Sequence, residues 1–96
     1  MYLTIAFYQF VRLENIEQLQ AIILKFCQKN NIKGTILLAS EGINGTISGQ
    51  KNNIHEFLAF IKKDPFLNGN FKNLEHKESW ASKNPFYRMK VRLKKE

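Results

Sequence analysis

The chain has 96 residues, of which 44% are hydrophobic, and it carries a formal net charge of +7. This length and apolar fraction are typical of one hydrophobic core, so we expect residues 1–96 to form a single domain. No apolar run reaches the ~20 residues of a membrane span, which excludes a membrane-spanning helix and a membrane partner. The chain does not begin with the basic-then-apolar pattern of a signal peptide, so we expect a cytoplasmic protein.

The first elements in chain order are a predicted strand and a predicted helix. Residues 2–11 are rich in β-branched and aromatic types and contain no Gly or Pro, which is typical of a central strand buried on both faces. From Glu14 onward, apolar residues recur at spacings of three and four as far as the Asn30-Asn31 pair. This period predicts an amphipathic helix.

A hairpin is predicted next. Residues 32–40 read as a second strand, and Asn44-Gly45 is a turn dipeptide that would lead into a short third strand over residues 46–48. The glycines of this connection adopt positive φ without steric cost, and its successive N–H groups would suit an anion-binding nest. The hairpin turn is the more frequent role. A nucleotide cradle is excluded because neither GxxxxGK[ST] nor GxGxxG is present.

The second half of the chain predicts a helix and at least one further strand. Apolar residues from Ile54 to Ile61 mark the helix, which Asp64 ends before Pro65. Residues 70–78, residues 86–94 or both complete the sheet. The later segment alternates a predicted buried side with a basic side; the buried side comprises Tyr87, Met89, Val91 and Leu93, and the basic side comprises Arg88, Lys90, Arg92 and Lys94.

The order strand, helix, strand, strand, helix, strand predicts an α+β, ferredoxin-like βαββαβ sandwich, with an antiparallel sheet and both helices on one face. The other face of the sheet would then stay open. We expect the side chains of Tyr8 and Phe10 to point there, and the basic residues to extend a binding surface on that face.

The positive charge is concentrated at the end of the chain, where five of the last ten residues are Arg or Lys. Such a stripe binds polyanions because neutralised phosphates release their counterions. Lysines on an edge strand also prevent pairing between sheets. Charge alone leaves both interpretations open.

No catalytic residue, metal site or cofactor site is predicted. Cys27 lies on the apolar stripe of the first helix, where a cysteine acts as a small buried hydrophobe. His55 and His76 lack a second ligand at helical spacing. Trp80 and Phe86 lie among basic residues, a pattern that suits stacking of unpaired RNA bases, although core packing is the commoner role. The third strand lacks the aromatics of an RNA recognition motif.

Three blocks carry a resemblance to a known family: FYQF near the start, GTILLASEGINGTISG in the middle, and KES followed by NPFYRMKVRLKKE at the end. Together they resemble the amino-terminal domain of the tRNA uridine hydroxylase family, also described as rhodanese-related. The resemblance covers nearly the whole chain, and EGINGT is its most specific part.

The resemblance implies an acylphosphatase-like fold and a part in a tRNA-modifying oxidoreductase, which uses molecular oxygen to form 5-hydroxyuridine at the wobble position. In that family a rhodanese-like domain, which holds the catalytic cysteine, follows the amino-terminal domain. The resemblance therefore implies that the catalytic domain is absent after residue 96, and that Cys27 does not take over its role.

The resemblance further implies a non-catalytic, RNA-binding module whose partners are tRNA and the rhodanese-like domain. We expect phosphate contacts from five residues: Lys77, Arg88, Lys90, Arg92 and Lys94. The EGINGT loop is expected to serve binding or docking, and it comprises Glu41, Gly42, Ile43, Asn44, Gly45 and Thr46. Which surface meets tRNA and which meets the second domain stays open, because both would be exposed and partly charged.

A small acylphosphatase-like hydrolase is the alternative. Those enzymes grip phosphate with an arginine in a glycine-rich turn after the first strand, and an asparagine on the second strand orients water. Arg12 follows the first strand here, but without the glycines that let backbone amides surround an anion. Leu37, Leu38 and Ala39 stand in the region of the asparagine. The sequence therefore favours the non-catalytic module.

Overall fold

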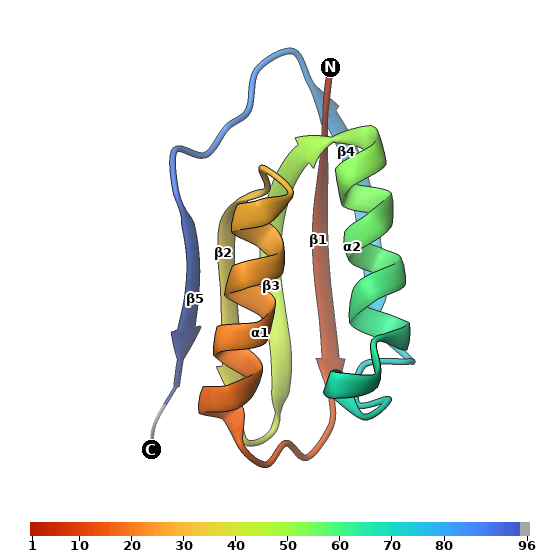
Figure 1. The fold of residues 1–96 in the computed structure, drawn as a ribbon. Coiled ribbons are helices and arrows are strands. Elements are labelled where there is room, and N and C mark those ends of the chain that lie inside the picture. The colour runs from red at the N-terminus through yellow and green to blue at the C-terminus, as the bar shows by residue number, and fades with distance from the viewer. Residues whose placement is uncertain (95–96) are drawn as a thin grey trace.

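The computed structural model describes residues 1–94, which form a five-stranded sheet with two helices on one of its faces (Figure 1). The elements in chain order are β1 (Tyr2–Phe10), α1 (Ile16–Lys29), β2 (Lys33–Ala39), β3 (Gly42–Gln50), α2 (Lys51–Lys63), the short 3-10 helix η1 (Pro65–Leu67), β4 (Glu75–Ala81) and β5 (Met89–Leu93). This is the predicted α+β, ferredoxin-like fold.

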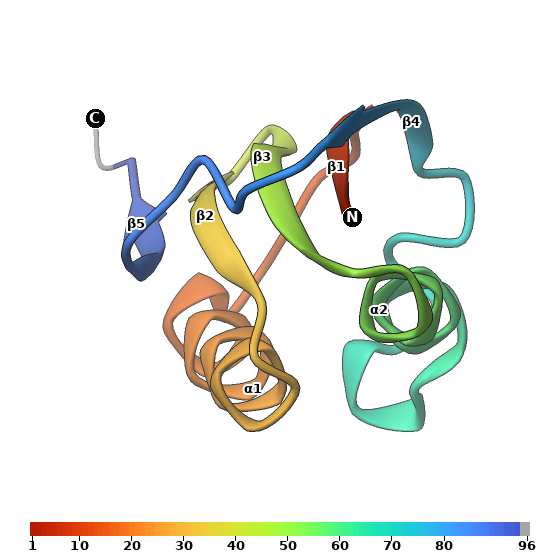
Figure 2. The same cartoon turned by 90° about the horizontal axis from the view of Figure 1, so that it is seen from above.

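The strands lie in the order β4-β1-β3-β2-β5. The first four are antiparallel to their neighbours, as predicted, whereas β5 runs parallel to β2 and makes the sheet mixed. Both of the late segments therefore join the sheet, one at each edge. The chain between β4 and β5 crosses the sheet on the side away from the helices (Figure 2).

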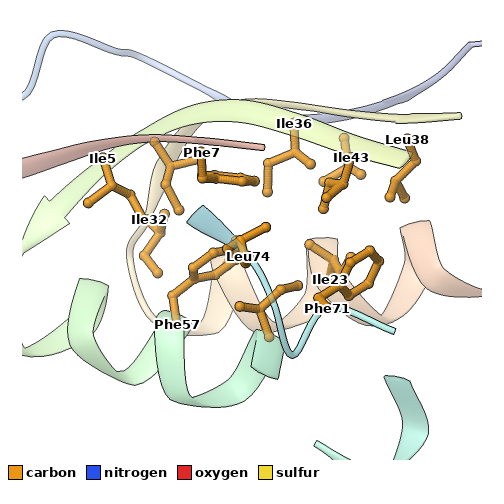
Figure 3. Close-up of a cluster of buried hydrophobic side chains, with 14 of the residues drawn as sticks. Ile5, Phe7, Ile23, Ile32, Ile36, Leu38, Ile43, Phe57, Phe71 and Leu74 are labelled. Carbon is orange, nitrogen blue, oxygen red and sulfur yellow. The ribbon is translucent and has the colours of Figure 1, made fainter. Parts of the chain in front are cut away.

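The core lies between the helices and the sheet. Helix α1 contributes Leu19, Ile23 and Cys27, and α2 contributes Ile54, Phe57 and Ile61, at the predicted helical spacing. Figure 3 shows Ile23 and Phe57 across from the sheet residues Ile5, Phe7 and Ile36. Neither helix within residues 1–94 has the length and apolar character that a membrane crossing requires.

Strand β1 is buried on one face only, so the prediction of burial on both faces is wrong. Leu3, Ile5 and Phe7 are buried, whereas Tyr8 is 48% exposed and Phe10 is 82% exposed. The reason is that both helices cover the same face of the sheet. The prediction that Tyr8 and Phe10 point to the open face is confirmed.

The hairpin turns at Ser40-Glu41, so the predicted turn at Asn44-Gly45 is wrong. Ala39 pairs with Gly42 and Leu37 pairs with Asn44, which places the Asn-Gly dipeptide inside β3. Burial sets this register, because a long β3 brings Ile43 and Ile47 onto the core face, and a slip by one residue would expose both.

Strand β5 begins at Met89, after the crossing segment. Val91 is buried and Met89 and Leu93 are half-buried, as predicted. Tyr87 is 93% exposed, so its predicted burial is wrong. The backbone explains the difference: pairing with β2 starts where the Gly34 N–H donates to the Arg88 carbonyl at 2.8 Å, and Tyr87 precedes that point.

Candidate nucleic-acid interface

The sheet face opposite the helices carries neighbouring polar and aromatic side chains. Tyr8 on β1 pairs with Asn44 on β3, and Thr46 lies between Ala6 on β1 and Thr35 on β2. Directly paired residues share a sheet face, and alternate residues of a strand share it too. These residues therefore form a continuous patch that no helix covers.

This open face contains a hollow of about 680 Å³, which we call the central hollow. Its lining includes Tyr8, Thr35, Asn44, Thr46, Lys77 and Phe86. A second hollow of about 140 Å³ shares Tyr8 and Asn44 with it and extends toward the Ser40-Glu41 turn. The Tyr8–Asn44 pair thus lies at the middle of the open face.

The crossing segment holds Phe86 over the open face. The Asn84 side-chain amide donates to the Ser48 carbonyl at 3.4 Å, and the Phe86 N–H donates to the Asn84 side-chain oxygen at 3.0 Å. Trp80, the other aromatic residue singled out in the sequence, pairs with buried Leu3 and so lies on the helix side of β4. Only Phe86 of the two lines the central hollow.

The five predicted phosphate contacts lie at the two edges of the open face. Lys90 and Arg92 pair with Thr35 and Leu37, and Arg88 and Lys94 follow the same alternation at the two ends of β5. Lys77 pairs with Ala6 on the opposite edge. Glu75 pairs with Tyr8 on the same face, so the β4 edge carries one charge of each sign. Three strands separate β4 from β5, so the two edges are roughly 19 Å apart at the usual strand spacing.

Most of these cations are free to meet a ligand. Arg88, Arg92, Lys94 and Lys77 are exposed, and Lys90 is half-buried. The Lys94 ammonium lies 3.7 Å from the Glu41 carboxylate, and both side chains are about half exposed. Such a surface ion pair is weak and exchanges easily for a phosphate contact.

The EGINGT segment, residues 41–46, divides by role. Gly42 and Ile43 are buried, and a side chain at Gly45 would lie 2.7 Å from the Thr35 carbonyl oxygen, so these three positions serve strand packing. Glu41, Asn44 and Thr46 are the accessible members. The prediction of a loop is correct only for Glu41, because residues 42–46 lie in β3.

The segment after β1 does not form the phosphate-binding loop of an acylphosphatase-like hydrolase. The Val11 N–H donates to the Glu41 carbonyl at 3.1 Å, and the Leu13 N–H donates to the Ser40 carbonyl at 2.8 Å. These two amides are therefore engaged within the chain rather than directed at an anion. The hollow beside Arg12 also includes Glu41, whose carboxylate repels phosphate.

Other reactive side chains lie away from the open face or are already paired. Burial raises the pKa of the Cys27 thiol from 9.0 to about 12. The His76 ring lies 3.0 Å from the Glu78 carboxylate. Within residues 1–94, no three His, Cys, Asp or Glu side chains gather into an arrangement that would hold a metal ion.

We expect the Cys27 thiol of the folded chain to react very slowly with Ellman's reagent. A pKa of about 12 in place of 9.0 lowers the thiolate fraction at mildly alkaline pH about a thousandfold, and burial blocks access as well. The measurement compares the native chain with the same chain unfolded in guanidinium. Equal rates in the two states would show that Cys27 is not in the core.

Comparison with known protein families gives one match over nearly the whole chain. The family model described as "UPF0176 acylphosphatase like domain" matches residues 2–96. Two curated relatives named tRNA uridine(34) hydroxylase, from Acaryochloris marina and Albidiferax ferrireducens, are 56% and 54% identical over 95 residues. The matches cover 99% of this chain but only 29% and 28% of the relatives, so the chain spans less than a third of their length.

Solved structures share the fold at low sequence identity. Full-length HypF in its phosphate- and nucleotide-bound form matches with a TM-score of 0.73 and 16% identity, over 97% of this chain and 12% of that one. A bacterial light-regulated adenylyl cyclase matches with a TM-score of 0.76 and 17% identity, over 97% and 28% of the two chains. At these identities the likeness shows the fold alone.

Proposed function

The chain belongs to the family of UPF0176 acylphosphatase-like domains, and we propose that it is the non-catalytic, RNA-binding domain of a cytoplasmic enzyme of the tRNA uridine(34) hydroxylase type. In this proposal tRNA is the partner of the open sheet face. The proposal assigns the oxidation itself to a separate, rhodanese-like domain.

The single observation that carries the proposal is a sheet face that no helix covers, with a row of cations along β5 and Lys77 on the opposite edge. Helices α1 and α2 occupy the other face, so the open face is the surface available to a large ligand (Figure 2). Arg88, Lys90 and Arg92 follow one another along one edge and Lys77 marks the other. Phosphates that span this face would displace counterions at both edges, and that release favours binding.

The chain's own residues supply binding rather than redox chemistry in this proposal. The buried Cys27 thiol stays protonated at neutral pH, so it is a poor nucleophile. Asn44, Thr46 and Tyr8 offer hydrogen bonds and an aromatic surface. These groups position RNA but do not activate oxygen.

The end of the open face near the hairpin turn suits docking of the second domain. Phe10 is 82% exposed there, and Glu41 and Lys94 lie beside it in the smaller hollow. An exposed aromatic with a charged pair at its margin is typical of an interface between domains. We therefore assign Phe10 and Glu41 to docking, and Arg88, Lys90, Arg92 and Lys77 to tRNA.

The proposal predicts salt-sensitive tRNA binding that depends on β5. A triple variant, Arg88→Gln with Lys90→Gln and Arg92→Gln, is compared with the wild-type chain at about 50 mM and about 200 mM salt. We expect the slope of log K against log salt to fall by about 2–3 in magnitude, because each lost phosphate contact removes slightly less than one released counterion.

The matched control removes the same number of charges from the helical side. It carries Lys25→Gln, Lys29→Gln and Lys63→Gln, three exposed residues of α1 and α2. Its tRNA binding should stay close to that of the wild-type chain. If both triple variants lose affinity equally, only net charge matters and the open face is not the binding surface. If the folded wild-type chain binds no tRNA, the proposed function is wrong.

A further inference from the structure

The central hollow has polar groups with no role inside the protein. Among the side-chain hydrogen bonds of residues 1–94, none involves Thr35, Asn44 or Thr46. All three line the hollow, and Asn44 is exposed. The Asn44 amide presents a donor and an acceptor side by side, which is the arrangement that pairs with the edge of a nucleobase.

Aromatic rings lie at two sides of the same hollow. Tyr8 contributes from β1, with its hydroxyl 3.4 Å from the Glu75 carboxylate and its ring in an edge contact with Phe10. Phe86 contributes from the crossing segment, which the Asn84 hydrogen bonds fix to β3. The Tyr8 side chain has two contacts within the chain and the Phe86 backbone is anchored, so less conformational freedom is lost when a planar ligand stacks on these residues.

We propose that the central hollow binds one unpaired nucleobase of an RNA strand. The base would stack on Tyr8 or Phe86 while its edge forms hydrogen bonds with Asn44 and Thr46. The inference rests on the proposed function, because the cations that would hold the flanking phosphates are those at the edges of the same face. Its new content is that the chain distinguishes unpaired from paired RNA.

The size and charge of the site favour this ligand. A hollow of about 680 Å³ lies within the range of roughly 300–1,000 Å³ that is usual for small-ligand sites. Lys77 lines the hollow at one side, where the Glu75 carboxylate accepts a hydrogen bond from Tyr8, and Lys90 lies beside Thr35 at the other side. A base in the hollow would therefore have a cation on either side for its phosphates. Bases of an RNA duplex cannot enter, since their edges are paired and stacked.

The test compares two RNAs of equal length, a hairpin with an unpaired loop and a fully paired duplex, each titrated at fixed salt. We expect the wild-type chain to bind the hairpin about tenfold or more tightly than the duplex, since stacking of one base is worth about 1–3 kcal/mol. Tyr8→Leu should remove most of this preference and leave duplex binding unchanged. Asn44→Ala, a second variant that deletes only a surface amide, should reduce it severalfold.

Phe66→Leu is the control, because Phe66 is a largely exposed aromatic of η1 that does not line the central hollow and is not among the aromatic contacts of Tyr8. It should retain the hairpin preference. The folded wild-type chain could instead bind hairpin and duplex with equal affinity, and lose both when the β5 cations are changed to Gln. The proposed base site would then be wrong, and the proposed function would stand. Binding of neither RNA would overturn both. A hairpin preference that survives Tyr8→Leu and Asn44→Ala would place base recognition elsewhere.

Discussion

Phe57→Ala is expected to lower the free energy of unfolding by about 3–5 kcal/mol, because it removes a fully buried aromatic side chain and leaves a cavity. The Phe57 ring lies 5.6 Å from that of Phe7 on β1 and 6.3 Å from that of Phe26 on α1. It therefore connects both helices to the sheet (Figure 3). In a domain this small, such a loss is a large part of the total stability.

Urea denaturation followed by circular dichroism measures this effect. Phe66→Ala is the control, since Phe66 is 76% exposed and its truncation should change the unfolding free energy by less than about 0.5 kcal/mol. A Phe57→Ala variant as stable as the Phe66→Ala variant would mean that α2 does not pack on the sheet as described. Because Phe57 lies on the helix side of the sheet and does not line the central hollow, RNA binding by the folded fraction should be unchanged.

The helices and the general fold were predicted well from the sequence. A helix that is buried on one side repeats its apolar residues every three or four positions, and this spacing is visible in the sequence. Leu19, Ile23 and Cys27 recur along α1 at the spacing that places them on one face, and α2 repeats the pattern. The order of elements then limits the possible topologies to a few. Local pattern was therefore sufficient for the ferredoxin-like arrangement.

Features decided by tertiary contacts were not predictable in this way. Asn44-Gly45 has the local preference of a turn, yet cross-strand packing of Phe7 against Gly45 and burial of Ile47 place the dipeptide within β3. Tyr87 continues the alternation of β5, but the strand begins only at Met89. In both cases pairing with a distant strand overrides a local signal.

The candidate site was predictable in part. The basic side of β5 follows from simple alternation, and Tyr8 was expected on the open face. Thr35 and Asn84 were not singled out, because a threonine in a strand and an asparagine in a connector carry no distinctive pattern. Alternation of Thr35 with buried Ile36 is the signal that could have placed Thr35 on the open face. No sequence pattern shows that residues 82–88 cross above it.

Gly42→Ala is expected to destabilise the fold by about 3 kcal/mol, although it adds only one methyl group. The backbone at Gly42 has φ of +152°, a conformation that residues with a side chain rarely adopt. An added Cβ would also lie 2.2 Å from the Gln9 carbonyl oxygen on β1. The substitution would therefore either strain the backbone or push β1 away from β3. The glycine at position 42 of the EGINGT segment is thus required by the packing of the sheet.

Gly49→Ala provides the matched control, because Gly49 lies in the same strand and is also buried. A Cβ there would have its closest neighbours at 3.5 Å, which is ordinary contact, so the unfolding free energy should change by less than about 1 kcal/mol. Urea titration of both variants gives the comparison. Equal stability of the two would show that β1 and β3 do not approach closely at Gly42, and the register that brings Asn44 beside Tyr8 would then be wrong. A large loss for Gly42→Ala alone would support that register, and with it the placement of the Tyr8–Asn44 pair at the centre of the open face.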